Sequence, residues 1–390
     1  MLIGLVGAPN KGKSTIFSAM TLNEVEIADY PFTTINPNLG VAYVTKKCVD
    51  IELNVKCNAR NSTCVGGIRH IPVNLIDVAG LVEGAHLGKG MGNQFLNDLA
   101  SADALIVVVD ASGKTDPGGN HCLGCDPSGD IGMVTGEIAE WLCSIIKRHE
   151  SAIAKSHDSA DALASVLTGL GVTKAQVSAA IDACYLPASS KGWSEAEVMK
   201  FVRELMKTSK PMLVAANKSD TREAEANVTK LKSEFGDAEV IDCSGAVELA
   251  LRRAAKQGLI DYVPGARDFK MLKEGIPQEQ SAALDYLRGF LRRKCTNIQE
   301  LLNRAVFETA KNIVVYPVED ERKYSDHGGF VLPDALLVRR GTTAMELAGK
   351  IHTDLAKNML YAIDARTKKH LDREYVLKDN DVIRIVSAAK

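Results

Sequence analysis

The residues best suited to do chemistry lie near the start of the chain, in the run Gly7-Ala8-Pro9-Asn10-Lys11-Gly12-Lys13-Ser14. It matches G-x-x-x-x-G-K-[ST] between an apolar run and a helical pattern, the context that a phosphate-binding loop requires. Glycines let backbone N–H groups close around phosphate oxygens, and the helix N-terminus adds positive potential. Lys13 would contact the β and γ phosphates, and the Ser14 hydroxyl would bind Mg²⁺. We predict a nucleoside triphosphate site formed by Gly7, Asn10, Lys11, Gly12, Lys13, Ser14 and Thr15.

Three shorter motifs at the ends of apolar runs narrow the choice of nucleotide. In Asp77-Val78-Ala79-Gly80, Asp77 can hold Mg²⁺ through water and the Gly80 N–H can contact the γ phosphate. In Asn217-Lys218-Ser219-Asp220, Asp220 would accept hydrogen bonds from guanine N1–H and the 2-amino group, while Asn217 and Lys218 brace and cover the base. Adenine lacks both donors and would leave the carboxylate unpaired. Ser244-Gly245-Ala246 could direct a backbone N–H at guanine O6, so the four motifs together predict GTP binding.

The runs that carry these motifs alternate with helical patterns, as in a mostly parallel sheet with helices on both faces. The runs are Leu2–Val6, Ile71–Ile76, Ala104–Val109, Met212–Ala216 and Glu239–Ile241. Ligands of such sheets bind beyond the carboxyl ends of the strands, where the motifs fall. We predict an α/β P-loop nucleotide hydrolase (NTPase) fold, with the GTPase domain over residues 1–125 and 208–265.

Helical patterns interrupt and follow this domain. Residues 126–207 contain no strand-like run and predict an inserted helical domain, with helices at Ile131–Arg148, Ser159–Thr168, Lys174–Cys184 and Ser194–Lys207. Asp158, Thr173 and Ser194 are the expected helix starts. Residues 266–311 form a helical connector, with helices over 281–294 and 297–309. Residues 312–390 predict a small α+β domain, with strands near 314–316, 335–338, 360–363 and 382–386 and one helix over 343–353.

Composition excludes several classes of protein. Hydrophobic residues make up 46% and charged residues 25% of the chain, and the net charge of −2 gives no global signal for nucleic acid. The longest apolar run, Ala104–Val109, is far shorter than the roughly 20 residues of a membrane span. There is no signal-peptide pattern, and nine cysteines suit a reducing compartment. We expect a cytoplasmic monomer without membrane contact.

Two longer segments resemble Obg-type GTPases of the YchF-related branch found in archaea and eukaryotes. Residues 30–40, YPFTTINPNLG, resemble the first switch of that family, and residues 77–92, DVAGLVEGAHLGKGMG, resemble its glycine-rich second switch. The helical insertion and the small C-terminal unit extend the resemblance over nearly the whole chain. It implies a C-terminal domain of the TGS, ubiquitin-like type and a switch-one Mg²⁺ ligand at Thr34 that engages only when a γ phosphate is present.

The chain departs from the family pattern at the base-reading motifs. Many YchF relatives carry Asn-x-x-Glu and favour ATP, whereas Asp220 here favours GTP. The family usually has Ser-Ala where this chain has Ser244-Gly245, from which we expect the same backbone contact in a looser loop.

The expected catalytic groups are Lys13, Thr34, Gly80 and Asn10. Leu81 occupies the position where Ras-like enzymes place a water-orienting glutamine, so slow intrinsic turnover is predicted. In some related GTPases an asparagine equivalent to Asn10 helps hold K⁺, which would neutralise developing charge, but Asn10 could equally only stabilise a turn. His86 could act as a base, although a solvent-facing histidine is the favoured interpretation. Slow turnover suits a switch whose segments 30–40 and 77–92 order with the γ phosphate.

Two further groups of residues could bind a ligand: basic residues near the C-terminus and a set of cysteines. Arg339, Arg340, Arg366, Lys368, Lys369 and His370 are local basic groups in a C-terminal domain that is not basic overall. Such runs usually form a solvated face, but the resemblance to TGS-bearing GTPases implies contact with the ribosome or its RNA. Zinc could combine Cys48, Cys57 and Cys64 with the pair Cys122 and Cys125, but no second C-x₂-C pair exists, so free thiols are the favoured interpretation.

The alternatives to a ribosome-associated GTPase switch are an ATP-hydrolysing protein of the same fold and a non-catalytic RNA-binding module that its nucleotide only stabilises. GTP or GDP, Mg²⁺ and possible K⁺ are the expected cofactors.

Overall fold

The computed structural model describes residues 1–22, 38–84, 98–156, 158–187, 190 and 192–388. Two compact units share the chain: one holds the described parts of 1–22, 36–40 and 74–301, and the other holds those of 23–35, 41–73 and 302–390. The four-part division expected from the sequence stays a prediction. Within the described ranges, no helix is both long and apolar enough to cross a bilayer.

A seven-stranded sheet positions the motifs of the first unit. Its strand order is β2-β4-β1-β5-β6-β7, with β3 paired to β4. The strands are β1 (Leu2–Val6), β2 (Leu39–Lys47), β3 (Thr63–Val65), β4 (Ile68–Asp77), β5 (Ala104–Asp110), β6 (Met212–Asn217) and β7 (Val240–Asp242). β1 is parallel to β4 and β5, and β5–β6 and β6–β7 are also parallel pairs. The carboxyl ends of these strands therefore meet at one edge of the sheet.

The predicted strands are confirmed, but β2 and β3 were not predicted. β5 is buried along its whole length, which is why its apolar run is unbroken. β2 and β3 are only partly buried, and both contain polar as well as apolar residues. Strands of this kind give a weak sequence signal because only part of their surface needs to be apolar.

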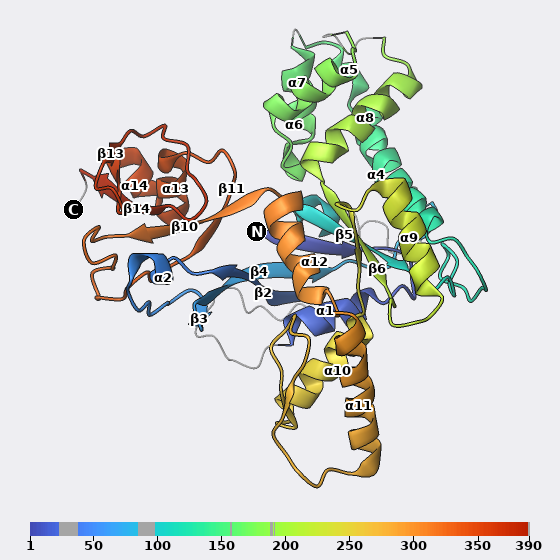
Figure 1. The fold of residues 1–390 in the computed structure, drawn as a ribbon. Coiled ribbons are helices and arrows are strands. Elements are labelled where there is room, and N and C mark those ends of the chain that lie inside the picture. The colour runs from blue at the N-terminus through green and yellow to red at the C-terminus, as the bar shows by residue number, and fades with distance from the viewer. Residues whose placement is uncertain (23–37, 85–97, 157, 188–189, 191, 389–390) are drawn as a thin grey trace. The chain divides into compact units, whose positions relative to one another are not determined.

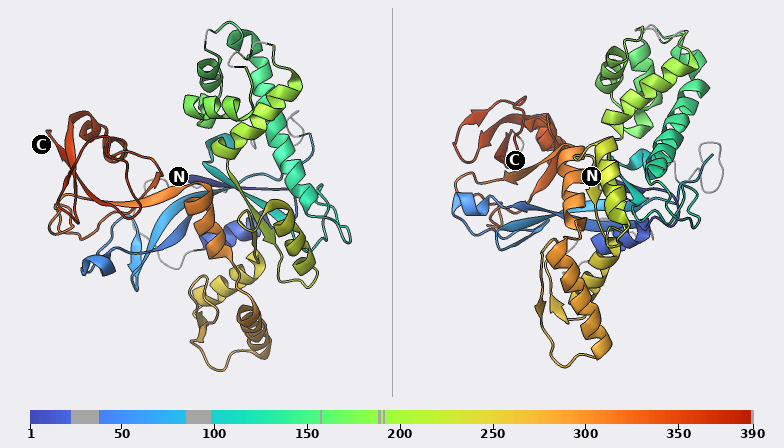
Figure 2. Two further views of the ribbon diagram at one scale, coloured as in Figure 1. Left: turned by 45° about the horizontal axis from the view of Figure 1, so that its top comes forward. Right: turned by 45° about the vertical axis from the view of Figure 1, so that its right-hand side comes forward.

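The helical insertion has the four helices that its periodicity predicts, α4 (Ser128–Arg148), α6 (Ser159–Val166), α7 (Lys174–Ala183) and α8 (Glu195–Ser209). A short helix that was not predicted, α5 (Glu150–Ile153), follows α4. Asp158, Thr173 and Ser194 cap α6, α7 and α8, as predicted, by accepting backbone N–H groups of the first turn. Figures 1 and 2 show α4 and α8 leading away from the sheet with α5 to α7 at their far end. One apolar core runs from strand residues such as Val107 to Trp141 and Phe201 in these helices.

The first unit has further helices outside the insertion, which Figures 1 and 2 show. They are α1 (Lys13–Thr21), α9 (Ala224–Phe235), α10 (Gly245–Lys256) and α11 (Gln278–Arg293). α10 and α11 share a core with the hairpin β8 (Ile260–Asp261) and β9 (Lys270–Met271). The helix expected over 297–309 is α12 (Ile298–Arg304) followed by a π-helical turn over Ala305–Thr309.

The second unit has a five-stranded sheet of order β11-β10-β14-β12-β13. Its strands are β10 (Asn312–Val318), β11 (Leu336–Arg339), β12 (Met359–Asp364), β13 (His370–Leu371) and β14 (Val382–Ser387). The single helix predicted over 343–353 is two helices, α13 (Ala344–Ile351) and α14 (Thr353–Asn358), because the extended His352 between them interrupts the first. The same unit contains β3 and the short helix α2 (Asp50–Leu53).

Candidate nucleotide-binding site

The phosphate loop joins β1 to α1, and its glycines are required by the backbone. Gly7 and Gly12 have φ angles of 149° and 91°, which side chains rarely allow. A Cβ at Gly7 would lie 2.5 Å from the carbonyl oxygen of Val108, and one at Gly12 would lie 2.3 Å from Nδ2 of Asn217. The loop is therefore packed between the neighbouring strand β5 and the base-reading motif.

Three side chains predicted to hold the phosphates and Mg²⁺ lie at this loop: Lys13, Ser14 and Asp77. The Ser14 hydroxyl donates a hydrogen bond to Oδ2 of Asp77 at 2.6 Å, and Oδ1 of Asp77 is buried without a partner among the described residues. Lys13 is 7% exposed and donates to the Ala8 carbonyl at 2.8 Å. Burial lowers the pKa of Lys13, and the nearby Asp77 opposes that effect. A hydroxyl beside an incompletely bonded carboxylate is a donor set that fits Mg²⁺.

Asn217 connects three segments that lie far apart in the sequence. Its Nδ2 donates to the Lys11 carbonyl at 2.9 Å, and its Oδ1 accepts the Gly245 N–H at 3.0 Å. Asp220 accepts a hydrogen bond from the Ser244 hydroxyl at 2.7 Å, which orients one edge of its carboxylate. The phosphate loop and the two base-reading motifs thus form one hydrogen-bonded group.

Gly245 serves close packing, which corrects the expectation of a looser loop. A Cβ at this position would lie 2.8 Å from Cγ1 and 3.3 Å from the backbone nitrogen of Ile16, on α1. Because Asn217 uses the Gly245 N–H, the Ala246 N–H is the group left without a partner in the described part of this motif. Ala246 is therefore better placed than Gly245 to donate to a base.

Lys218 has a fixed position that depends on a residue missed by sequence reasoning. Its ammonium group donates to the Asn10 carbonyl at 3.0 Å and pairs with Asp110 at 2.8 Å. Asp110 ends β5, lies in register with Asn217, and is 1% exposed. Burial would raise the pKa of Asp110, but hydrogen bonds from Lys218, Ser112 and Thr115 hold it below its usual range. The sequence feature that could have indicated this role is that Asp110 ends an unbroken apolar run.

Lys11 does not present its side chain to the nucleotide, although it lies within the phosphate loop. It is fully buried, bonds to Thr115 and to the Asp116 carbonyl, and pairs with Asp130 at 2.9 Å. Asp130 is at the start of α4, so a buried ion pair joins the phosphate loop to the helical insertion. Only the backbone of Lys11 is left to contact a phosphate.

Asn10 makes the turn contact that the sequence analysis gave as one alternative. It has a φ angle of 63°, and its Nδ2 donates to the Gly119 carbonyl at 3.0 Å. Its Oδ1 has no partner in the described part of the chain, so a contact with K⁺ is compatible with this geometry.

The described part of the second switch begins against the core. Leu81 is 1% exposed and belongs to the apolar core, and its N–H donates to the Gly7 carbonyl at 3.1 Å. Further along this segment, the Gly84 N–H donates a hydrogen bond to Oε1 of Glu137, on α4, at 2.7 Å. Thr34 and His86 lie outside the described residues, as do residues 30–37 of the first predicted switch and 85–92 of the second.

The cysteines fall into separate groups. Cys122 and Cys125 are joined by a disulfide, so the prediction of free thiols is wrong for this pair; the turn between them brings their Cα atoms to 6.1 Å. The other seven cysteines form no disulfide. Cys48, Cys57 and Cys64 lie together in the second unit.

The basic groups of the C-terminal domain do not all remain available. Arg366 pairs with Glu52, and the Lys368 ammonium lies over the Tyr324 ring at 4.8 Å. Arg339, Arg340 and Lys369 are exposed. Next to Lys369, the rings of His370 and Tyr361 are stacked, with centroids 4.3 Å apart.

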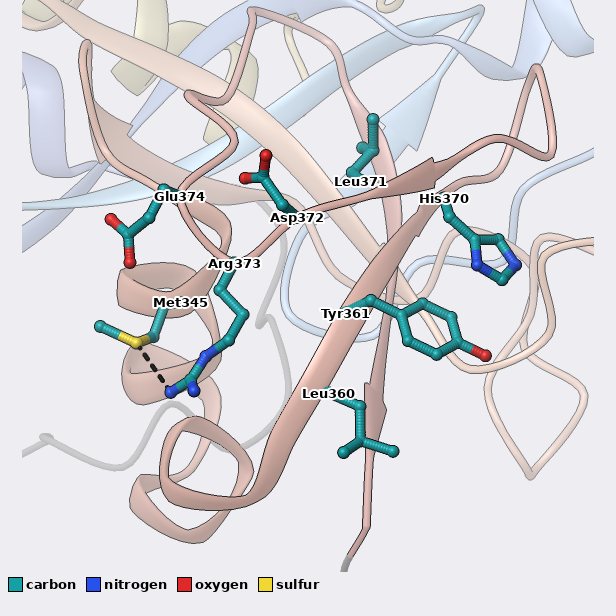
Figure 3. Close-up of a pocket in the computed structure, with 8 residues that line it drawn as sticks. All are labelled: Met345, Leu360, Tyr361, His370, Leu371, Asp372, Arg373 and Glu374. Carbon is teal, nitrogen blue, oxygen red and sulfur yellow. Dashed lines mark hydrogen bonds between the residues drawn. The ribbon is translucent and has the colours of Figure 1, made fainter.

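This aromatic pair borders a shallow pocket of about 700 Å³. Figure 3 shows Tyr361 and His370 side by side on β12 and β13, while Arg373 reaches Met345, with Nη2 3.1 Å from the sulfur. Acidic residues, Asp372 and Glu374, line the same pocket. The face is mixed in charge, and its distinctive feature is the stack of the half-buried Tyr361 on the exposed His370.

A mostly parallel sheet with a phosphate loop after its first strand and an Asn-Lys-x-Asp motif after β6 defines a P-loop protein of the GTPase fold. Comparisons with known proteins agree. Residues 2–135 match the family described as 50S ribosome-binding GTPase, residues 215–320 match the G4 motif-containing domain of YGR210-like Obg-like GTPases, and residues 329–387 match the TGS domain.

The relatives extend over the whole chain. An uncharacterized GTP-binding protein of Methanocaldococcus jannaschii is 49% identical over 395 residues, with full coverage of both chains. The human Obg-like ATPase 1 is 27% identical, covering 98% of this chain and 91% of the relative. The crystal structure of a GTP-binding protein from Pyrococcus horikoshii has a TM-score of 0.79 at 37% identity and covers 100% of both chains. The chain belongs to the Obg-like GTPase family of the YchF type, with a C-terminal TGS domain.

Proposed function

We propose that this protein binds GTP with Mg²⁺, hydrolyses it slowly to GDP and phosphate, and acts as a switch on the ribosome or its RNA. The observation that carries the proposal is Asp220, whose carboxylate is oriented by the Ser244 hydroxyl beside the loops joined by Asn217. A carboxylate there accepts two hydrogen bonds from guanine, and adenine offers neither. The names of the relatives from M. jannaschii and P. horikoshii, both GTP-binding proteins, also support this choice.

Different groups of the site would bind the phosphates and the Mg²⁺ ion. Backbone N–H groups of the loop from Gly7 to Gly12 and the Lys13 ammonium would hold the phosphates. Ser14 would bind Mg²⁺ directly and Asp77 through water. The ion supplies charge neutralisation on the β and γ phosphates. Because Leu81 is buried and apolar, no side chain at that position orients a water, and slow turnover follows.

Base choice is tested by measuring GTP, ATP and xanthosine triphosphate affinities for the wild type and Asp220→Asn. Two hydrogen bonds to a charged group contribute about 1.5–3 kcal/mol each, so GTP binding should weaken by at least about 10²-fold, while xanthosine triphosphate binding should improve. Asp237→Asn, an exposed aspartate of the same unit, is the matched control and should change nothing. Tight binding of ATP but not of GTP would favour the ATP-dependent alternative, which the name of human Obg-like ATPase 1 suggests.

Hydrolysis is tested by phosphate release with GTP in K⁺ or Na⁺ buffer, with and without ribosomes. We expect slow release that ribosomes accelerate, and a K⁺ effect that Asn10→Ala abolishes. Absence of turnover in every condition would support the non-catalytic RNA-binding module instead.

The partner is tested by co-sedimentation with ribosomal subunits in the presence of a GTP analogue or GDP. Stacking of a base on an aromatic ring contributes about 1–3 kcal/mol, so removing the half-buried ring of Tyr361 with Tyr361→Ala should weaken binding roughly 5- to 150-fold. Lys369→Glu should weaken it in a salt-dependent way. Lys155→Glu, on the helical insertion, is the control and should bind normally.

A further inference from the structure

Three thiols and one carboxylate converge in the second unit, outside the nucleotide site. Cys48 follows β2, Asp50 begins α2, Cys57 lies in the irregular segment after α2, and Cys64 is in β3. Their four ligand atoms all lie within 4.8 Å of one another. Cys48 and Asp50 are buried, and Cys57 and Cys64 are half-buried.

Three of the ligand-atom distances in this cluster lie near those of a tetrahedral zinc site. The sulfurs of Cys48 and Cys57 are 3.9 Å apart, and Oδ2 of Asp50 lies 3.0 Å from the Cys57 sulfur and 3.7 Å from the Cys64 sulfur. With Zn–S bonds of about 2.3 Å and a Zn–O bond of about 2.0 Å, tetrahedral geometry places two sulfurs about 3.8 Å apart and a sulfur and an oxygen about 3.5 Å apart. Small shifts of side chains would therefore accommodate the ion.

The backbone around the cluster holds the four residues in place. The Cys48 N–H donates to the Gly67 carbonyl at 2.8 Å, and the Val55 N–H donates to the Asp50 carbonyl at 3.0 Å. Gly66 and Gly67, with φ angles of 58° and 77°, form the tight turn between β3 and β4. A Cβ at Gly67 would lie 2.4 Å from Cδ1 of Ile51, on α2, so the turn packs closely on the element that carries Asp50.

Two buried polar groups at the cluster are incompletely satisfied. Oδ1 of Asp50 has no hydrogen-bond partner among the described residues. Arg69 lies opposite Cys64 in the β3–β4 ladder, so both side chains project from the same face of the hairpin. It is fully buried, and its side-chain hydrogen bonds go to the Ser62 hydroxyl and the carbonyls of Leu332 and Pro333.

Arg69 therefore has no carboxylate partner in the described part of the chain, and its Nη1 is unbonded. A buried cation without a counter-charge is strongly unfavourable. Zn²⁺ bound by three thiolates and one carboxylate would carry a net charge of −2 and would supply that counter-charge.

We propose that Cys48, Asp50, Cys57 and Cys64 bind one structural Zn²⁺ ion. Binding releases one proton from each of the three thiols and changes no oxidation state. All four positions are occupied by protein ligands, as in a structural rather than a catalytic zinc site. Thiolate ligands in a tetrahedral arrangement favour zinc over Mg²⁺, which prefers six oxygen ligands.

The ion would add a constraint to a segment that is otherwise held by side-chain contacts, such as the ion pairs of Arg60 with Asp326 and Asp334. The segment between α2 and β3 has no regular secondary structure, yet the Asn58 N–H donates to the Val331 carbonyl at 3.0 Å and the Arg60 N–H to the Pro333 carbonyl at 2.7 Å. An ion bound by residues before, within and after this segment would fix the backbone groups that bond to residues 331 and 333. None of the three cysteines forms a disulfide in this structure, and the Cys48–Cys57 sulfur distance of 3.9 Å is far longer than an S–S bond of about 2.05 Å.

The test measures metal content of the full-length, untagged protein by mass spectrometry after gel filtration. We expect about one zinc per chain in the wild type, and at least a five-fold loss in Cys57→Ser and in Cys64→Ser. Cys295→Ser, a free and half-buried cysteine of the other unit, is the matched control and should retain zinc. Equal zinc in all variants, or a wild type that retains none and takes up none from added Zn²⁺, would overturn the proposal.

A second measurement does not depend on the folding of a variant. Wild-type protein loaded with Co²⁺ should show thiolate-to-cobalt charge transfer and the visible bands of tetrahedral cobalt, and one equivalent of Zn²⁺ should remove both. Octahedral cobalt spectra without charge transfer would contradict the ligand set. GTP affinity measured on the same samples keeps this result separate from the proposed nucleotide function, because the nucleotide-site groups described above lie in the first unit.

Discussion

The buried pair between Lys11 and Asp130 gives a sharp test of how the helical insertion supports the phosphate loop. In Asp130→Ala the Lys11 ammonium would stay buried with only neutral acceptors, namely the hydroxyl and carbonyl of Thr115 and the Asp116 carbonyl. Removing one partner of a buried ion pair costs about 3–5 kcal/mol. Because three neutral acceptors remain, we expect the lower value, about 3 kcal/mol, which is a change of roughly 10²-fold in the unfolding equilibrium.

The assay is urea unfolding followed by tryptophan fluorescence. Trp141 is buried on α4, the helix that also carries Asp130, and the chain has only 2 tryptophans. With a denaturant slope of about 3 kcal/mol per molar, the midpoint should fall by roughly 1 M. The double variant Lys11→Met/Asp130→Leu removes both charges and should recover most of the loss. A single variant as stable as the wild type, or a double variant less stable than the single one, would refute this account of the pair.

Three further predictions concern other parts of the first unit. Gly12→Ala should weaken nucleotide binding by about 10²-fold or more in a fluorescence titration. Gly12 has a φ angle of 91°, and an added Cβ would lie 2.3 Å from Nδ2 of Asn217. Gly169→Ala, where an added Cβ meets open space, is the control and should bind normally. Tyr262→Phe removes a 2.9 Å hydrogen bond to the buried Glu248 and should cost about 2 kcal/mol in unfolding monitored by circular dichroism, with the exposed Tyr286→Phe as an unaffected control. Burial would raise the pKa of Asp242, but hydrogen bonds from Lys294 and Lys232 hold it below its usual range, so its stabilisation is present above the unfolded pKa of about 3.9 and is lost as pH falls further. Asp242→Asn should therefore be less stable than the wild type at pH 7, and urea titrations below about pH 4 should show the difference shrinking; a constant difference would contradict the assignment.

The motifs could be found from the sequence because each lies where a strand ends. Gly7, Asp77 and Asn217 follow apolar runs, and parallel strands bring such positions to one edge of the sheet. The helix starts at Asp158, Thr173 and Ser194 were also predictable, because a capping side chain acts within its own first turn. These features depend on residues that are neighbours in the chain.

Features that depend on distant residues were missed or misjudged. The role of Asp110 required knowing that β5 lies in register with β6 beside Lys218. The packing of Gly245 on Ile16 is invisible in a motif that otherwise suggests a flexible loop. Asp50 has no cysteine-like signature, so it joined the cluster with Cys48, Cys57 and Cys64 only through the fold.

The sequence by itself determined the fold class and the position of the phosphate-loop and Asn-Lys-x-Asp motifs at strand ends, because each follows from residue type and local spacing. Only the tertiary structure decided which side chains remain available at those motifs. It buries Lys11 against Asp130, assigns the Gly245 N–H to Asn217, and gathers a metal-binding set from three separate segments. The physical reason is that hydrogen bonds and ion pairs are satisfied by whichever groups packing brings within about 3 Å, regardless of their separation along the chain.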